Sequence, residues 1–123
     1  MTATVAEVYH SLPRDEQATA CILASNYGEA GAINYYGSQY HLPQAISGHN
    51  MYYLWGPGNC TGDVVVSIGY PLPLLQRTFG NVVQASTSIC QYCIPMFNHL
   101  PVYVARHIKI PMKAAWIKFK HYD

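Results

Sequence analysis

The spacing of apolar residues predicts a helix at the start of the chain. Val5, Val8, Tyr9 and Leu12 recur at the period of one helix face. Thr4 and Glu7 are placed as in a capping box, which satisfies the first backbone N–H groups of a helix. We therefore expect a helix over residues 4–12, followed by a polar connection at 13–16.

The next apolar segments alternate between strand and helix patterns. Residues 18–24 are apolar apart from Thr19, which is typical of a strand buried on both faces of a parallel sheet. Asn26 and Glu29 are placed to cap a helix that Gly37 ends. Further strands are expected at 44–47, 63–68 and 102–105, and residues 81–89 lean towards strand. Short helices are expected at 71–80 and 111–118, the second packing Trp116 onto the core.

This alternation predicts an α/β fold. Strands that alternate with helices form a layered, mostly parallel sheet of about five strands with flanking helices, in the Rossmann-like or flavodoxin-like manner. The chain has 123 residues, half of them hydrophobic, which is enough to build one core. We expect a single α/β domain spanning residues 1–123.

Charge argues against nucleic acid as a partner. Charged residues make up 11% of the chain, against about 25% in an average soluble domain. The net charge is +1, and Lys and Arg cluster only at 109–120.

The longest apolar stretch, 64–75, is broken by Ser67, Gly69 and two prolines, so no transmembrane helix is expected. The low charge predicts that part of the surface is covered in the native context.

The four cysteines leave several pairings open. Cys21 lies in an apolar strand and is interpreted as a buried small hydrophobe. Cys60, Cys90 and Cys93 lie in polar loops, where Cys60 pairs with one of the other two or Cys90 pairs with Cys93. A zinc set of these three with His99 is a weaker alternative, because one CxxC pair alone is a poor signal. No metal and no cofactor are predicted.

The first candidate ligand site is the turn between strand 18–24 and the following helix. Asn26, Tyr27 and Glu29 would stand at the helix start, where N–H groups and the helix dipole favour an anionic or hydroxyl-rich ligand. The alternative is a capping box, with Asn26 and Glu29 satisfying the helix start and no ligand involved. Capping explains both polar positions but does not explain Tyr27.

The second candidate site is an aromatic segment bounded by glycines and a proline. It contains His49, Asn50, Tyr53 and Trp55. Aromatic faces suit stacking on the apolar C–H faces of sugar rings, and the polar side chains suit sugar hydroxyls. The alternative is an interface with another domain, where Tyr and Trp are enriched.

No catalytic set is predicted. The chain lacks the G-x-S-x-G, G-x-G-x-x-G and P-loop patterns, and its only adjacent carboxylates are Asp15 and Glu16 in a polar turn. An enzyme using Glu29 and His49 as acid and base is the least favoured hypothesis. We therefore predict no catalytic residues in this chain.

Several segments carry a resemblance to a known family: Asn26-Tyr27-Gly28-Glu29-Ala30-Gly31, Gly37-Ser38-Gln39-Tyr40-His41-Leu42-Pro43, Ser47-Gly48-His49-Asn50, Tyr53-Leu54-Trp55-Gly56-Pro57 and Trp116. With these segments the chain resembles the soluble carboxyl-terminal domain of bacterial multi-spanning glycosyltransferases related to the dolichyl-phosphate-mannose protein mannosyltransferases. The resemblance implies an extracytoplasmic domain that covers or assists a membrane-embedded active site using a lipid-phosphate-linked sugar. The implied partners are the transmembrane part of the same polypeptide, the lipid-linked sugar and a glycan acceptor. The competing hypothesis is a stand-alone binding module for a small polar or carbohydrate ligand.

Overall fold

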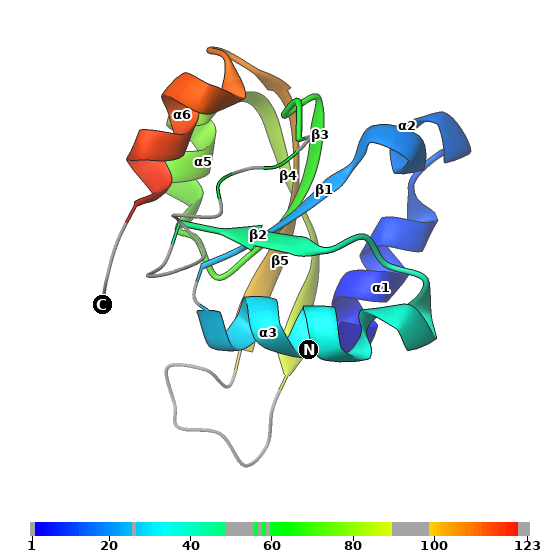
Figure 1. The fold of residues 1–123 in the computed structure, drawn as a ribbon. Coiled ribbons are helices and arrows are strands. Elements are labelled where there is room, and N and C mark those ends of the chain that lie inside the picture. Colours follow the sequence, from blue (N-terminus) through cyan, green and yellow to red (C-terminus); the bar gives the residue numbers. More distant parts are fainter. Residues whose placement is uncertain are drawn as a thin grey trace.

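The computed structural model describes residues 2–25, 27–48, 56, 58, 60–89 and 99–120 (Figure 1). Helices and strands alternate along most of this part of the chain. The elements are α1 (Thr2–Ser11), α2 (Arg14–Thr19), β1 (Cys21–Ala24), α3 (Tyr27–Tyr36), the 3-10 helix η1 (Gly37–Tyr40), β2 (Ala45–Ser47), β3 (Val64–Ile68), α5 (Leu72–Thr78), β4 (Phe79–Ile89), β5 (His99–Ile108) and α6 (Met112–Phe119).

The five strands form one mixed sheet in the order β2-β1-β3-β5-β4. β1 is parallel to β2 and β3, whereas β5 is antiparallel to β3 and β4 in longer ladders. Most paired residues are therefore antiparallel, and the prediction of a mostly parallel Rossmann-like or flavodoxin-like sheet is wrong. The reason is the connection at 90–98, which is shorter than the dozen or so residues of a parallel crossover. β5 is therefore antiparallel to β4, and it lies between β3 and β4 in the sheet.

Helices α1 and α3 cover one face of the sheet (Figure 1). Val5 and Val8 of α1 and Ile33 of α3 are buried against Ile22, Val66 and other apolar side chains of the central strands. This confirms the helix predicted from the spacing of apolar residues at the start of the chain. The packed stripe removes apolar surface from water, the main stabilising term in folding.

Helices α5 and α6 cover the opposite face. Leu75, Trp116 and Phe119 pack there against side chains such as Leu23 and Val65. Every residue of β1 and β3 is buried because both faces of these strands are covered, which the sequence had predicted for the strand at 18–24. The predicted packing of Trp116 onto the core is confirmed.

Helix α2 was not predicted. Residues 14–19 form this helix where a polar connection and the start of a strand were expected, so β1 begins only at Cys21. Asp15 and Glu16 lie in its first turn, where carboxylates favour the positive end of the helix dipole. The expected helix stop at Gly80 is also wrong, because α5 ends at Thr78 and Gly80 belongs to β4.

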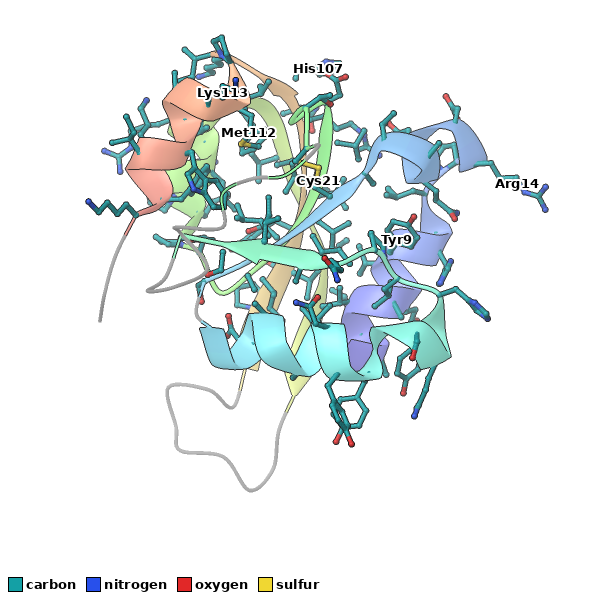
Figure 2. The ribbon with its side chains drawn as sticks, viewed as in Figure 1. Tyr9, Arg14, Cys21, His107, Met112 and Lys113 are labelled. Atoms are coloured by element: carbon teal, nitrogen blue, oxygen red, sulfur yellow. A yellow bond between two sulfur atoms is a disulfide. The ribbon has the colours of Figure 1, made fainter. Side chains whose placement is uncertain are left out.

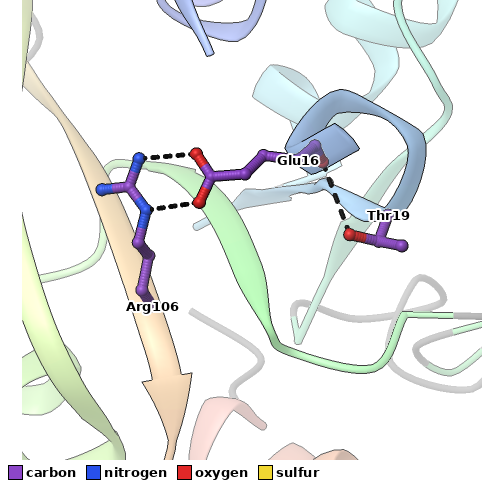
Figure 3. Close-up of polar contacts among 3 residues, drawn as sticks. All are labelled: Glu16, Thr19 and Arg106. Atoms are coloured by element: carbon purple, nitrogen blue, oxygen red, sulfur yellow. Dashed lines mark hydrogen bonds and ion pairs between the residues drawn. The ribbon is translucent and has the colours of Figure 1, made fainter. Parts of the chain in front are cut away.

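A bidentate ion pair ties α2 to the sheet (Figure 3). Arg106 of β5 donates from Nε and Nη2 to the two carboxylate oxygens of Glu16, each over 2.9 Å. The hydrogen bond from Arg106 lowers the pKa of Glu16, against an opposing effect of desolvation. The ion pair therefore holds the short helix α2 against strand β5.

None of the helices in the described part of the chain has the length and apolar character needed to cross a bilayer.

Candidate functional site

The parallel strands β1, β2 and β3 end in register at one edge of the sheet. Ala24 of β1 lies opposite Ser47 of β2 on one side and Ile68 of β3 on the other. The residues that follow the strands are Ser25, Gly48 and Gly69. Open α/β sheets bind ligands at this carboxyl edge, and both predicted sites start from it.

Glu29 is buried at the carboxyl edge, in the first turn of α3, and its carboxylate binds the residue that precedes this helix by two positions. Its Oε1 accepts hydrogen bonds from the Ser25 backbone N–H over 3.1 Å and from the Ser25 hydroxyl over 2.7 Å, and only 7% of the residue is exposed. The carboxylate thus reaches back to the chain before the helix, as in a capping box. This arrangement favours the capping interpretation of Glu29 over the binding of sugar hydroxyls.

Gly69 allows β3 to approach this cap closely. Its φ is +91°, and a Cβ at this position would overlap the Ser25 hydroxyl and lie 2.8 Å from Glu29 Oε1. The Ser25 N–H also donates to the carbonyl of Ile68 over 3.0 Å. The chain leaving β3 therefore closes directly over the start of α3.

Tyr70 joins three elements at the same edge. Its buried hydroxyl accepts a hydrogen bond from the Gly48 N–H over 3.0 Å and donates to the carbonyl of Phe119 over 3.2 Å. Burial raises the pKa of Tyr70 to about 12, and the nearby charge of Glu29 adds to the rise, whereas hydrogen bonds with Gly48 and Ser47 oppose it. The tyrosine therefore stays neutral and holds the end of β2 to the end of α6.

Gly48 is required for this contact. A Cβ on Gly48 would overlap the carbonyl group of Phe119, so only glycine lets the two backbones meet. Sequence reasoning missed Tyr70, although a tyrosine two residues after an apolar strand is a recognisable signal of a polar group at the sheet edge.

The described residues place only part of the predicted ligand sites. Tyr27 begins α3, and Glu29 lies in its first turn. Asn26 and the aromatic segment, with His49, Asn50, Tyr53 and Trp55, lie outside the described residues. The pairing of Glu29 with His49 as acid and base therefore stays a hypothesis from sequence.

A disulfide bond follows the aromatic segment. Cys60 is bonded to Cys21, with 5.8 Å between the two Cα atoms, and Figure 2 shows Cys21 at the amino end of β1. The interpretation of Cys21 as a free buried side chain is wrong, and so is the pairing of Cys60 with Cys90 or Cys93. The sulfur of Cys60 is oxidised, so it is no zinc ligand here.

The other members of the predicted zinc set are not placed. Cys90 and Cys93 lie outside the described residues, as does the side chain of His99. Among the described side chains, no group of three or more His, Cys, Asp or Glu is arranged to hold a metal ion.

A hollow lies at the opposite, amino edge of the sheet. Its volume is about 680 Å³, and it is bordered by the first residues of β1 and β2 and by the chain around Cys60. The polar residues Thr19, Gln44 and Thr61 are among those that line it. Asn34 also borders it, with its Oδ1 accepting a hydrogen bond from the Ala45 N–H over 2.7 Å. The hollow is thus far along the strands from the cap at Glu29.

No protein-family model matches the chain, and no curated protein or solved structure is significantly similar to it. The resemblance to membrane glycosyltransferases therefore stays a prediction from the sequence.

Proposed function

We propose that this chain is the non-catalytic, extracytoplasmic domain of a membrane glycosyltransferase that uses a lipid-phosphate-linked sugar donor. In this proposal the aromatic segment 49–55 contacts the sugar-bearing substrate, and the rest of the domain holds that segment in place. The transmembrane part of the same polypeptide carries the catalytic residues, as the resemblance implies.

The observation that carries the proposal is that the chain is held at Gly48 and at Cys60, on either side of the aromatic segment. On one side, the Gly48 N–H is held by the buried hydroxyl of Tyr70. On the other side, Cys60 is covalently bonded to Cys21 of β1. A binding segment needs fixed ends, because ordering a free loop on binding costs conformational entropy. The framework therefore suits presentation of the segment between these two points.

The disulfide also supports an extracytoplasmic location. Disulfides form and persist in oxidising compartments and are rare where glutathione and thioredoxin keep thiols reduced. Cys21 and Cys60 are 39 residues apart in sequence and meet only in the folded domain. Their pairing agrees with maturation outside the cytoplasm.

The residue types in the segment fit the chemistry of a sugar phosphate. Tyr53 and Trp55 offer aromatic faces for the apolar side of a pyranose ring, and His49 and Asn50 offer hydrogen bonds to hydroxyl groups. The segment is the stronger of the two predicted sites, since the carboxylate of Glu29 is already engaged with Ser25.

Tryptophan fluorescence tests the proposal with the whole chain. The protein has two tryptophans, and Trp116 is buried in the core. A short-chain polyprenyl-phosphate-mannose is titrated into the wild type and the variants Trp55→Phe and Trp116→Phe. We expect a saturable change that persists in Trp116→Phe and disappears in Trp55→Phe.

Two matched measurements make the result interpretable. Tyr53→Ala should weaken binding, whereas Tyr35→Ala, at an exposed position on α3, should not. Mixing the chain with donor and a peptide acceptor should give no mannose transfer. Lack of binding, or transfer by the chain alone, would overturn the proposal.

A stand-alone carbohydrate-binding module is the second candidate, and the hollow at the amino edge favours it. That hollow is lined by the polar residues Thr19, Gln44 and Thr61 beside apolar residues, as many small-ligand sites are. In this case free monosaccharides should shift the NMR signals of these residues and leave Trp55 unchanged. The gene also discriminates, because about eight or more upstream transmembrane segments would favour the transferase.

A further inference from the structure

Charge is segregated along the sequence. No Asp or Glu occurs from residue 64 to residue 122, whereas every Lys and Arg except Arg14 lies in this part of the chain. The acidic residues before it include Glu7, Asp15 and Glu16. A net charge of +1 therefore conceals an acidic first half and a basic second half.

The fold gathers much of the positive charge on the α5 and α6 side of the sheet. Arg77 ends α5, and exposed lysines flank or occupy α6: Lys109, Lys113, Lys118 and Lys120. Figure 2 shows Lys113 on α6 and Arg14 on the far side of the molecule. The buried face of α6, which includes Met112, Trp116 and Phe119, packs on the core, so its lysines point outward.

Local structure explains some of these charges but not all of them. Arg77 donates to the carbonyl of Pro73 and Lys109 to that of Gln76, and Lys118 lies at the negative end of the α6 dipole. Lys113 lies in the first turn of α6, where the helix dipole disfavours a cation. The helix dipole therefore does not explain a lysine at this position.

An exposed isoleucine completes this face. Ile117 is one helical turn beyond Lys113 and is 68% exposed. We define the α6 face as Lys113, Ile117, Lys118 and Lys120. A large aliphatic side chain among lysines is the pattern of a helix that lies on an anionic lipid surface, with its charges at the headgroups and its apolar residue in the interface.

We propose that the α6 face docks on the surface of a bilayer containing anionic phospholipid. Charge complementarity carries this assignment, and Ile117 favours lipid over nucleic acid, whose phosphates offer an aliphatic side chain nothing to bury against. The proposal goes beyond the sugar-binding function and stands without it. The backbone contact of Phe119 with Gly48 joins the end of this face to the start of the aromatic segment.

Vesicle partitioning of the whole chain tests the proposal. Sedimentation is measured with pure phosphatidylglycerol vesicles and with pure phosphatidylcholine vesicles, neither containing a sugar lipid. Binding should occur only on the anionic vesicles and should weaken as salt rises. Lys113→Gln should lower the partition coefficient about fivefold, and Ile117→Ser about tenfold.

Each variant has a matched control on the opposite side of the molecule. Arg14→Gln changes the net charge as Lys113→Gln does, and Tyr35→Ser removes an exposed apolar side chain as Ile117→Ser does. Neither control should alter partitioning, and unfolding midpoints confirm that all variants fold. Equal losses in Lys113→Gln and Arg14→Gln, or no anionic preference, would overturn the proposal. So would tight binding of duplex DNA that Ile117→Ser leaves unchanged.

Discussion

At the scale of single residues, sequence reasoning succeeded where the partner is nearby in the chain. The spacing of Glu29 from the helix start predicted that its carboxylate reaches back to the chain before the helix. In the structure the carboxylate accepts hydrogen bonds from Ser25. Tyr70 escaped prediction because its partners, Gly48 and Phe119, are distant in sequence and meet only in the folded sheet. The pairing of Cys21 with Cys60 escaped for the same reason, since spacing alone does not determine connectivity.

Tyr70→Phe should destabilise the domain. Loss of the hydroxyl leaves the Gly48 N–H and the Phe119 carbonyl without this buried partner, which costs about 2 kcal/mol. Urea unfolding measures the free energy, with Tyr35→Phe at an exposed position as control. A free energy of unfolding equal to that of the wild type would show that the Tyr70 hydroxyl does not stabilise this edge of the sheet.

The same variant separates the pH dependence of Tyr70 from that of other groups. Its pKa is about 12 in the folded protein and about 10 in an unfolded chain. Its contribution is therefore complete below pH 10 and declines as the pH rises from 10 towards 12. Between pH 9 and pH 11, the wild type should lose about 1 kcal/mol more than Tyr70→Phe.

The double variant Cys21→Ser, Cys60→Ser should unfold more easily. The bond closes a loop between residues 39 apart. In the chain-entropy description, removing it increases the conformational entropy of the unfolded chain and lowers the free energy of unfolding by about 4 kcal/mol. Thermal unfolding measures the loss, and mass spectrometry after alkylation of the unreduced wild type checks the bond itself. Alkylated thiols at both positions in protein matured outside the cytoplasm would contradict the pairing.

At the scale of elements, apolar periodicity identified the helices and strands that pack on the core. Apolar spacing located α1, whereas capping residues and Gly37 located α3, and a run of β-branched residues located β3. Periodicity missed α2, which contributes no buried residue and is held instead by Arg106. Periodicity also says nothing about the order of strands, and the placement of β5 between β3 and β4 decided the sheet.

Gly69→Ala tests the junction between β3 and the cap of α3. The positive φ and the overlap with Ser25 and Glu29 should cost about 3 kcal/mol together. Gly58→Ala is the matched control, because Gly58 also has a positive φ but a Cβ there lies more than 4 Å from the other described residues, so only about 1 kcal/mol is expected. Equal losses in the two variants would show that the close approach at Gly69 has no energetic weight.

The tether between α2 and β5 should weaken in acid. The hydrogen bond from Arg106 lowers the pKa of Glu16 below its usual 4.5, so its stabilising contribution is present above that pH and is lost as the pH falls through the folded value. The wild type should therefore lose more stability from pH 6 to pH 3 than Glu16→Gln. Parallel acid dependence in urea unfolding of both proteins would exclude this contribution.

At the scale of the whole molecule, a mixed sheet is covered by helices on both faces, and the chain is held at Gly48 and Cys60 on either side of the aromatic segment. The carboxyl edge is closed by the protein's own groups, since Glu29 and Tyr70 bind chain neighbours there. The sequence predicted a ligand site or a helix cap at this edge, and the hydrogen bonds of Glu29 agree with the cap, whereas the contacts of Tyr70 were not predicted. The described part of this edge therefore acts as a support, and the binding residues are proposed in the segment that leaves it at Gly48.

Intermolecular NMR contacts test this central claim most directly. The labelled chain is mixed with short-chain polyprenyl-phosphate-mannose, and nuclear Overhauser effects are recorded between mannose protons and aromatic rings. We predict contacts to the rings of Trp55 and Tyr53. Contacts confined to the exposed tyrosines of α3 and η1, Tyr35, Tyr36 and Tyr40, or no contacts at saturating ligand, would contradict the account.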